Sequence, residues 1–292
     1  MNMLYRIRIS ACVLACVLLS WQLPARCADA GEPQTYAPVT VAMKPVQVSE
    51  HVWFVQGEAG VATDNEGFIS NAGFVVTGAG VVVFDALGSP SLGDALLKQI
   101  RTVTSEPVVR VIVSHYHADH IYGLQVFEDL EAEILAPVGA EKYLDSEQAA
   151  ERLEERRFTL DPWVNEDTRL VYPDSMLEEG AHFRLGDVEF IVTVVGNAHS
   201  DGDLTLFVVP DRVLFSGDII FEGRVPFLGD ANTARWVQVL ERMEREQLVA
   251  LVPGHGGVAA RPNEAIGLTR RYLAYLREHM GAAVEEFEPF DD

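Results

Sequence analysis

The stretch Val111-Ile112-Val113-Ser114-His115-Tyr116-His117-Ala118-Asp119-His120 decides both the fold and the chemistry of this chain. The β-branched run that opens it is typical of a buried parallel strand, and the loops after such strands carry the functional groups of α/β proteins. Three imidazoles and one carboxylate follow within six positions. Neutral imidazole is the usual nitrogen ligand of zinc, and aspartate supplies an oxygen ligand. His115 and His117 alternate on an extended segment and can share one metal, while Asp119 and His120 face a second.

Three later apolar runs end in the same way, with a glycine-bearing turn and then a metal-type side chain. These side chains are His199, Asp218 and His255. Glycine lets the backbone turn sharply and approach closely beside a ligand. Any one of these turns alone would be ordinary, and the histidine loop alone would pass for a solvated polar loop. Together they predict seven ligands from four strand ends.

Strand-like and helix-like runs alternate along the chain in two similar halves. Gly73–Val76 and Val81–Asp85 flank a glycine-rich turn and predict a hairpin, and leucines at helical spacing predict a helix over Ser91–Val103. The charge-heavy run Val138–Phe158 predicts a long solvated helix, with a lid over the site as the alternative. The second half is β-rich and closes in helices. We therefore expect an α/β fold of two face-to-face sheets with helices outside, forming one domain over residues 31–292.

The composition is that of a globular protein with a strongly acidic surface. The chain has 292 residues, 48% of them hydrophobic and 23% charged, and its formal net charge is −22. Such a surface repels phosphate backbones and anionic membranes, so nucleic acid is excluded as a partner. We expect a small-molecule substrate and no membrane span in the mature chain.

The first thirty residues have the pattern of a secretory signal peptide. Arg6 and Arg8 precede the apolar run Ala11–Leu19, and Ala28-Asp29-Ala30 offers a cleavage site. An uncleaved anchor or a lipoprotein signal is the alternative. The three cysteines all lie in this segment, so cleavage leaves a chain without thiolates. The prediction is a signal peptide over residues 1–30 and a periplasmic or secreted protein.

The ligand set resembles that of the metallo-β-lactamase-fold superfamily over nearly the whole mature chain, and Asp85 matches the superfamily's first motif. The resemblance implies an αββα four-layer sandwich of mixed sheets with two Zn²⁺ ions at one edge, iron or manganese being alternatives. It assigns His115, His117 and His199 to the first metal, Asp119, His120 and His255 to the second, and Asp218 as a bridge. It also implies a nucleophilic hydroxide between the ions, with Asp119 orienting the hydroxide or shuttling a proton, and a supporting role for Asp85.

Two features separate the branches of that superfamily. Two classes of metallo-β-lactamase use a cysteine near position 218, which the mature chain lacks, and Asp218 is closer to the hydroxyacylglutathione-hydrolase pattern. The run Arg224–Thr233 resembles a hallmark of exported zinc hydrolases associated with sulphur-oxidation and quinoprotein systems, which implies a functional link to such a system. Arg224 is a candidate for binding a substrate carboxylate or sulfonate, or is an ordinary surface arginine. Tyr116 either donates to an oxyanion or packs beside the metals.

These residues favour an exported binuclear zinc hydrolase that acts on a small ester, a thioester or a related substrate. An iron-dependent persulfide dioxygenase is the first alternative, with one iron held by His115, His199 and Asp218. A β-lactamase activity and a non-enzymatic accessory of a quinoprotein are the others. Metal content separates the hydrolase from the dioxygenase.

Overall fold

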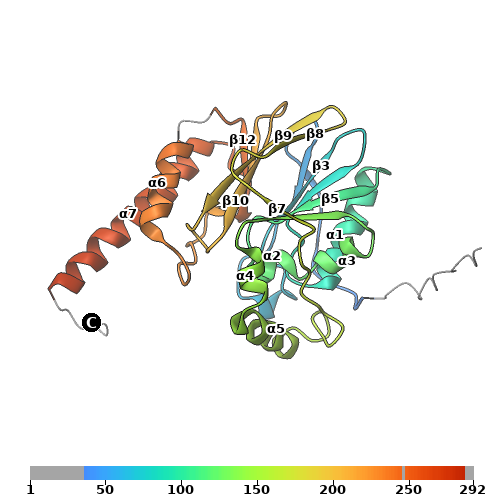
Figure 1. The fold of residues 1–292 in the computed structure, drawn as a ribbon, viewed down its shortest axis with the longest axis horizontal. Coiled ribbons are helices and arrows are strands. Elements are labelled where there is room, and N and C mark those ends of the chain that lie inside the picture. The colour runs from blue at the N-terminus through green and yellow to red at the C-terminus, as the bar shows by residue number, and fades with distance from the viewer. Residues whose placement is uncertain (1–35, 245–246, 287–292) are drawn as a thin grey trace, which may run out of the picture. The chain divides into compact units, whose positions relative to one another are not determined.

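Two mixed β-sheets packed face to face form the centre of the computed structural model, which describes residues 36–244 and 247–286 (Figure 1). From Tyr36 onward the chain groups as one compact unit. The first sheet has seven strands in sequence order: β1 Val46–Gln47, β2 Val52–Val55, β3 Ala72–Val76, β4 Val81–Phe84, β5 Val108–Ile112, β6 Glu133–Pro137 and β7 Ser175–Leu177. The second has five, in the order β12 Ala250–His255, β11 Val213–Phe221, β10 Asp203–Val208, β9 Val188–Gly196 and β8 His182–Leu185.

The register of the first sheet brings two predicted site segments to one edge. Strands β1 to β4 are antiparallel, and β4 to β7 are parallel. Phe84 pairs with Ile112, so β4 and β5 end side by side. Asp85 and the histidine loop therefore leave the sheet at the same place.

The second sheet repeats this arrangement with its only parallel pair. Strands β8 to β11 are antiparallel, and β11 runs parallel to β12 with Phe215 opposite Val252. The register shifts around Gly217, which has a φ of +50°. A Cβ at this position would lie 2.6 Å from the Cβ of Ser114, so the glycine lets the two sheets approach closely beside the histidine loop. Asp218 and His255 consequently come to the same edge as that loop.

Apolar side chains fill the space between the sheets. Phe84 of the first sheet stacks on Phe215 of the second with ring centroids 5.2 Å apart, and Ile112 and Val252 are buried beside them. Each such side chain contributes about 1.5–3 kcal/mol through burial. The interface explains why the β-branched strands carry apolar residues on both faces, since their opposite faces pack on helices.

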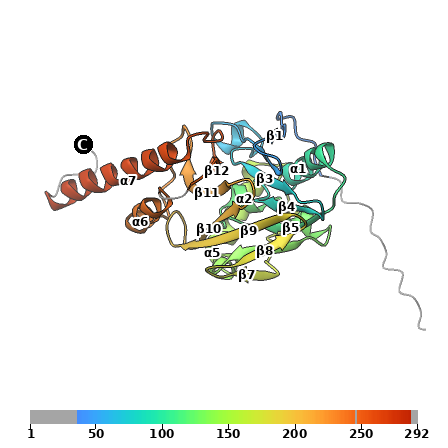
Figure 2. The same ribbon diagram turned by 90° about the horizontal axis from the view of Figure 1, so that it is seen from above.

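Helices cover both outer faces, which completes the four layers (Figure 2). The first sheet carries α1 Pro90–Val103, α2 Ala118–Ile121, α3 Leu124–Glu128, α4 Ala140–Leu144 and α5 Glu147–Thr159. The second carries α6 Thr233–Met243 and α7 Pro262–Glu285. The predicted αββα sandwich with mixed sheets is confirmed.

One predicted element was wrong. The single helix expected over Val138–Phe158 is two helices, α4 and α5, because Ser146 ends one and caps the next. Its hydroxyl donates to the carbonyl of Tyr143 at 2.6 Å and accepts from the amide of Ala149 at 3.1 Å. The predicted signal peptide, residues 1–30, lies outside the described residues. Among the helices described, none is long and apolar enough to span a membrane.

Candidate metal centre

The loop after β5 and the short helix α2 together carry four of the seven predicted ligands. His115 and His117 lie on its extended part, and Asp119 and His120 lie in the first turn of α2. His115 and His120 are almost fully buried, whereas about a fifth of the His117 side chain is exposed. The loop thus presents two ligands before the helix begins and two after.

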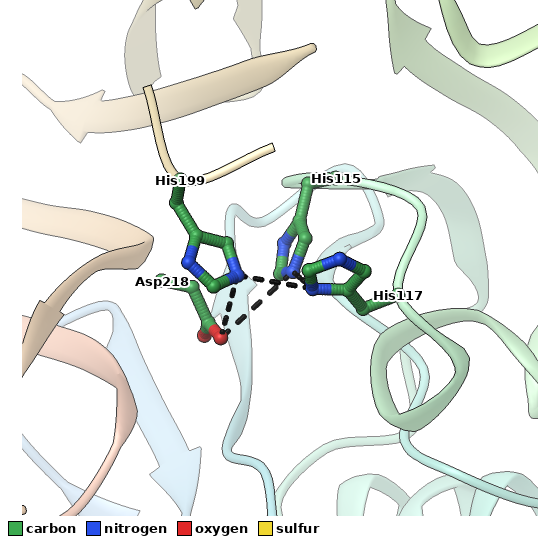
Figure 3. Close-up of side chains that lie close together, drawn as sticks. All are labelled: His115, His117, His199 and Asp218. Carbon is green, nitrogen blue, oxygen red and sulfur yellow. Dashed lines mark hydrogen bonds and ion pairs between the residues drawn. The ribbon is translucent and has the colours of Figure 1, made fainter. Parts of the chain in front are cut away.

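The first cluster joins this loop to the second sheet (Figure 3). Nδ1 of His117 lies 3.0 Å from Nε2 of His115 and 3.0 Å from Nε2 of His199, which follows β9. Oδ2 of Asp218, in β11, lies 3.3 Å from Nε2 of His199 and 3.8 Å from that of His115. Four donor atoms therefore converge on one point.

The second cluster lies against the first and shares Asp218 with it. Oδ2 of Asp119 lies 3.5 Å from Nε2 of His120 and 3.3 Å from Nε2 of His255, at the end of β12. Asp218 faces both imidazoles, with Oδ1 3.3 Å from His120 and Oδ2 3.3 Å from His255. The carboxylate of Asp218 therefore faces both clusters.

The donor atoms of the two clusters are spaced as ligands around metal ions rather than as hydrogen-bond partners of one another. Ligands about 2.0–2.1 Å from a tetrahedral zinc lie about 3.3 Å apart, which is the middle of the observed distances. In the first cluster, three ring nitrogens crowd together although only one of each facing pair can donate a proton. Within the described chain, Nε2 of His120 and Oδ1 of Asp218 are buried and lie 3.3 Å apart, yet neither makes a hydrogen bond of good geometry. Histidine nitrogen and carboxylate oxygen are ligands that zinc accepts, so the residues present can hold two metals.

In three of the histidines, Nδ1 points away from the clusters and contacts a neighbouring polar group. Asp85 accepts hydrogen bonds from the amide and the hydroxyl of Ser114, both at 2.7 Å, and lies 2.9 Å from Nδ1 of His120. The Ser114 hydroxyl also lies 2.9 Å from Nδ1 of His115. Nδ1 of His255 lies 2.8 Å from the carbonyl of Ile69. Such contacts leave Nε2 of each ring free for a metal.

Asp203 supports the turn that carries one predicted ligand, although its sequence context does not single it out. It is buried at the start of β10 and accepts hydrogen bonds from the amides of Ala198, His199 and Ser200. Burial raises the pKa of Asp203 to about 7, although these hydrogen bonds pull it down. The side chain holds the turn that carries His199. The run His199-Ser200-Asp201-Gly202-Asp203 contains two aspartates, and only the structure shows which one turns inward.

The two clusters differ in their electrostatics. Burial lowers the pKa of His115, and it lowers the pKa of His199 to about 4. In the second cluster burial acts in the same direction, but Asp218 and Asp119 overcome it. They raise the pKa of His120 well above its ordinary value and that of His255 to about 9. Without metal, the second cluster is therefore an ion-paired network of protonated imidazoles and carboxylates.

Two cavities open beside the clusters and contain the predicted substrate-binding residues. Tyr116 is buried and lines a cavity of about 360 Å³ beside His117. Its hydroxyl has no hydrogen-bond partner among the described residues. Arg224 lines a second cavity of about 300 Å³, and its Nη1 donates to the carbonyl of Ile69 at 2.9 Å. Both residues therefore line cavities beside the clusters, and the guanidinium of Arg224 already makes one hydrogen bond to the backbone.

The chain belongs to the metallo-β-lactamase superfamily, whose family model matches residues 65–255. It is a metal-dependent hydrolase of that superfamily.

Two proteins with different activities are similar in sequence to this chain. The metallo-β-lactamase IND-1 of Chryseobacterium indologenes is 22% identical over 72% of this chain and 80% of its own. The acyl-coenzyme A thioesterase MBLAC2 of Gallus gallus is 29% identical to this chain in the matched region. The match covers 49% of this chain and 55% of the thioesterase. A solved metallo-β-lactamase from Pontibacter korlensis has a TM-score of 0.64 at 19% identity and covers 80% of this chain and 99% of its own. That likeness shows the fold.

Proposed function

We propose that this protein is an exported hydrolase that uses two zinc ions to cleave a small ester or thioester. The observation that carries the proposal is the shared position of Asp218, whose two carboxylate oxygens face histidines of both clusters at 3.3 Å. In this proposal His115, His117 and His199 hold one metal, Asp119, His120 and His255 hold the other, and Asp218 bridges them. When bound, two zinc ions supply a Lewis acid and lower the pKa of bound water to about 7.

The chain's own residues would orient the water and the proton. The Asp119 side chain is about one-fifth exposed, lies between His120 and His255, and lines the open cavity. It is placed to accept a proton of the attacking water. In thioester hydrolysis the water oxygen forms the new C–O bond, the C–S bond breaks, and the proton goes to the leaving thiolate. Asp85 and Asp203 would act only by positioning histidines.

Two further parts of the proposal rest on sequence patterns. The signal-peptide pattern over residues 1–30 supports export to the periplasm or beyond. The run Arg224–Thr233 supports a functional link to a quinoprotein or sulphur-oxidation system. The thioesterase relative supports a thioester substrate, and the β-lactamase relative supports lactam hydrolysis as a secondary activity.

A mononuclear iron oxygenase is the competing function, because the first cluster has the His115, His199 and Asp218 set that such an enzyme needs. Metal analysis of protein purified without added metal tests the two against each other. About two zinc ions per chain, together with hydrolysis of a thioester or ester in a substrate panel, is the expected result. One iron per chain with oxygen uptake on a persulfide would overturn the proposal.

The His117→Ala substitution provides the matched test within the chain. His117 is partly exposed, so its removal should leave the fold intact while metal content and hydrolysis fall together. Loss of a direct ligand should exceed the roughly 10–100-fold effect typical of supporting residues. His182→Ala, on the exposed edge strand β8, is the control and should change neither. Undiminished hydrolysis by the His117 variant would reject the assignment.

A further inference from the structure

Helix α5 lines the cavity beside the metal clusters with arginines, a role that its charge-heavy sequence did not predict. The cavity of about 300 Å³ is lined by His117, Asp119 and His255 of the clusters and by Arg152 and Arg156 of α5. These arginines lie one helical turn apart, so they present their side chains on the same face of α5. A substrate with its reacting bond at the clusters would extend toward them.

Arg156 is a cation without a counterion in the described chain, since no carboxylate lies within 4.0 Å of its guanidinium and no acceptor within hydrogen-bond distance. Its neighbour Arg157 is fully engaged, because it pairs with Glu154 and donates to the carbonyls of Asn165 and Thr168. Arg152 donates to Glu155 on the solvent side at 2.6 Å. Arg157 therefore has a structural role, whereas Arg156 faces the cavity with its hydrogen-bonding capacity unused.

The other charges around the cavity do not neutralise this wall. Asp119 and Asp218 belong to the clusters, and Asp230, about half exposed, lies 3.3 Å from Nε2 of His117. Arg224 adds a third arginine near His255. Three arginines around one cavity stand out in a chain with a formal charge of −22.

Apolar residues also line the cavity. Val225 and Phe227 belong to its lining, and these residues are 73% and 56% exposed. The Phe227 ring lies 5.9 Å from that of His117, edge to face. The cavity thus combines reactive groups, an apolar surface and cationic side chains.

We propose that Arg156, together with Arg152, binds an anionic group at the far end of a short apolar acyl chain, so that the substrate is an anionic acyl compound. The planar fork of arginine suits a carboxylate or a sulfonate. This inference rests on the proposed hydrolase function for the placement of the reacting bond at the clusters.

Hydrolysis of two matched thioesters tests the inference. The succinyl and butyryl thioesters of one neutral thiol have the same chain length and differ by one carboxylate. With the zinc-loaded full chain, Arg156→Gln should raise KM for the succinyl ester about tenfold or more and leave kcat and the butyryl ester nearly unchanged. Arg101→Gln, an exposed arginine of α1 outside both cavities, is the matched control and should alter neither. An equal change for both esters would overturn the inference.

A binding measurement on the metal-free full chain separates this inference from the hydrolase proposal. Hexanoate, hexane-1-sulfonate and neutral hexanamide are titrated calorimetrically, so that no anion can bind through zinc. The wild-type chain should prefer at least one of the anions to the amide by about tenfold, and Arg156→Gln should lose this preference. The preferred anion distinguishes a carboxylate from a sulfonate substrate. Equal binding of the amide and both anions would reject the anion site, whereas absence of hydrolysis with the preference intact would reject only the hydrolase proposal.

Discussion

Nδ1 of His120 lies 2.9 Å from the carboxylate of Asp85, 35 positions earlier in the chain. The same carboxylate holds the amide and hydroxyl of Ser114, whose oxygen contacts His115. One buried aspartate therefore orients a histidine in each cluster, although it belongs to neither. It can do so because β4 and β5 end side by side in the first sheet.

The Asp85→Asn substitution should lower zinc affinity about 10–100-fold while the fold is retained. Asparagine keeps the shape of the side chain but has only one oxygen that accepts hydrogen bonds. Its NH2 group cannot accept the N–H of His120 or the hydrogen bonds from Ser114. Competition with a chromophoric chelator measures the affinity. Asp94→Asn, which removes an exposed i,i+4 pair with Lys98, is the control and should leave it unchanged. Unaltered affinity in the Asp85 variant would show that the contact has no role in ligand orientation.

Gly254→Ala should displace the bridging aspartate. A Cβ at Gly254 would lie 1.9 Å from Oδ1 of Asp218, closer than any real contact, so the carboxylate must move. We expect metal content to fall at both clusters and hydrolysis to fall by more than about a hundredfold. Gly281→Ala, in open space on α7, is the control and should be neutral or slightly stabilising. A Gly254 variant with full metal content would mean that Asp218 is dispensable.

Metal binding should release protons from the second cluster. Near pH 7.5, His255 and His120 carry protons in the metal-free chain because their pKa values are raised, and coordination requires neutral imidazoles. His115 and His199 have lowered pKa values and are already neutral. One zinc should therefore bind with release of about two more protons than the other. Its affinity should rise with pH as His255 titrates near pH 9 and as His120 loses its proton.

Calorimetry in buffers of different ionisation enthalpy measures this release, because the observed heat then depends on the protons transferred. The expected result is two binding events with different buffer dependence. Two events with the same dependence would contradict the electrostatic difference between the clusters.

Trp236→Ala should destabilise the fold by about 3–5 kcal/mol. The side chain is completely buried in α6, donates to the carbonyl of Ile219 at 3.0 Å and lies 5.3 Å from the ring of His199. Urea denaturation measures the loss in free energy of unfolding. Trp163→Ala, at a partly exposed loop position, should cost much less. Similar losses in the two variants would show that Trp236 is not part of the packed core.

Sequence patterns were sufficient to predict which seven side chains come together, because each one follows an apolar run within a few residues. The loops after β5 and β9, the second half of β11 and the end of β12 meet at one edge, so local signals such as that of His199 or His255 converge there. Asp203 gave no comparable signal, since its role depends on three amides that face it in space.

Helix α5 shows why the sequence did not predict the arginines that line the cavity. A run with many charges has the composition of a solvated surface whether or not one face lines a cavity, and Arg156 differs from Arg157 only in what surrounds it. The break at Ser146 was also missed, because an N-cap serine within a continuous charged run resembles an ordinary helical position. The sheets were easier to predict, since a β-branched run such as Val81–Phe84 has few alternatives.

Each cluster takes ligands from both sheets: His115, His117, Asp119 and His120 from the first, and His199, Asp218 and His255 from the second. Bound metal would therefore act as a cross-link between the two halves of the chain, and the sheets could not separate without releasing it. At a free metal concentration of a hundred times Kd, each site would add about 2.7 kcal/mol to the free energy of unfolding. The supply of metal would then set the stability of the folded chain as well as its hydrolytic activity.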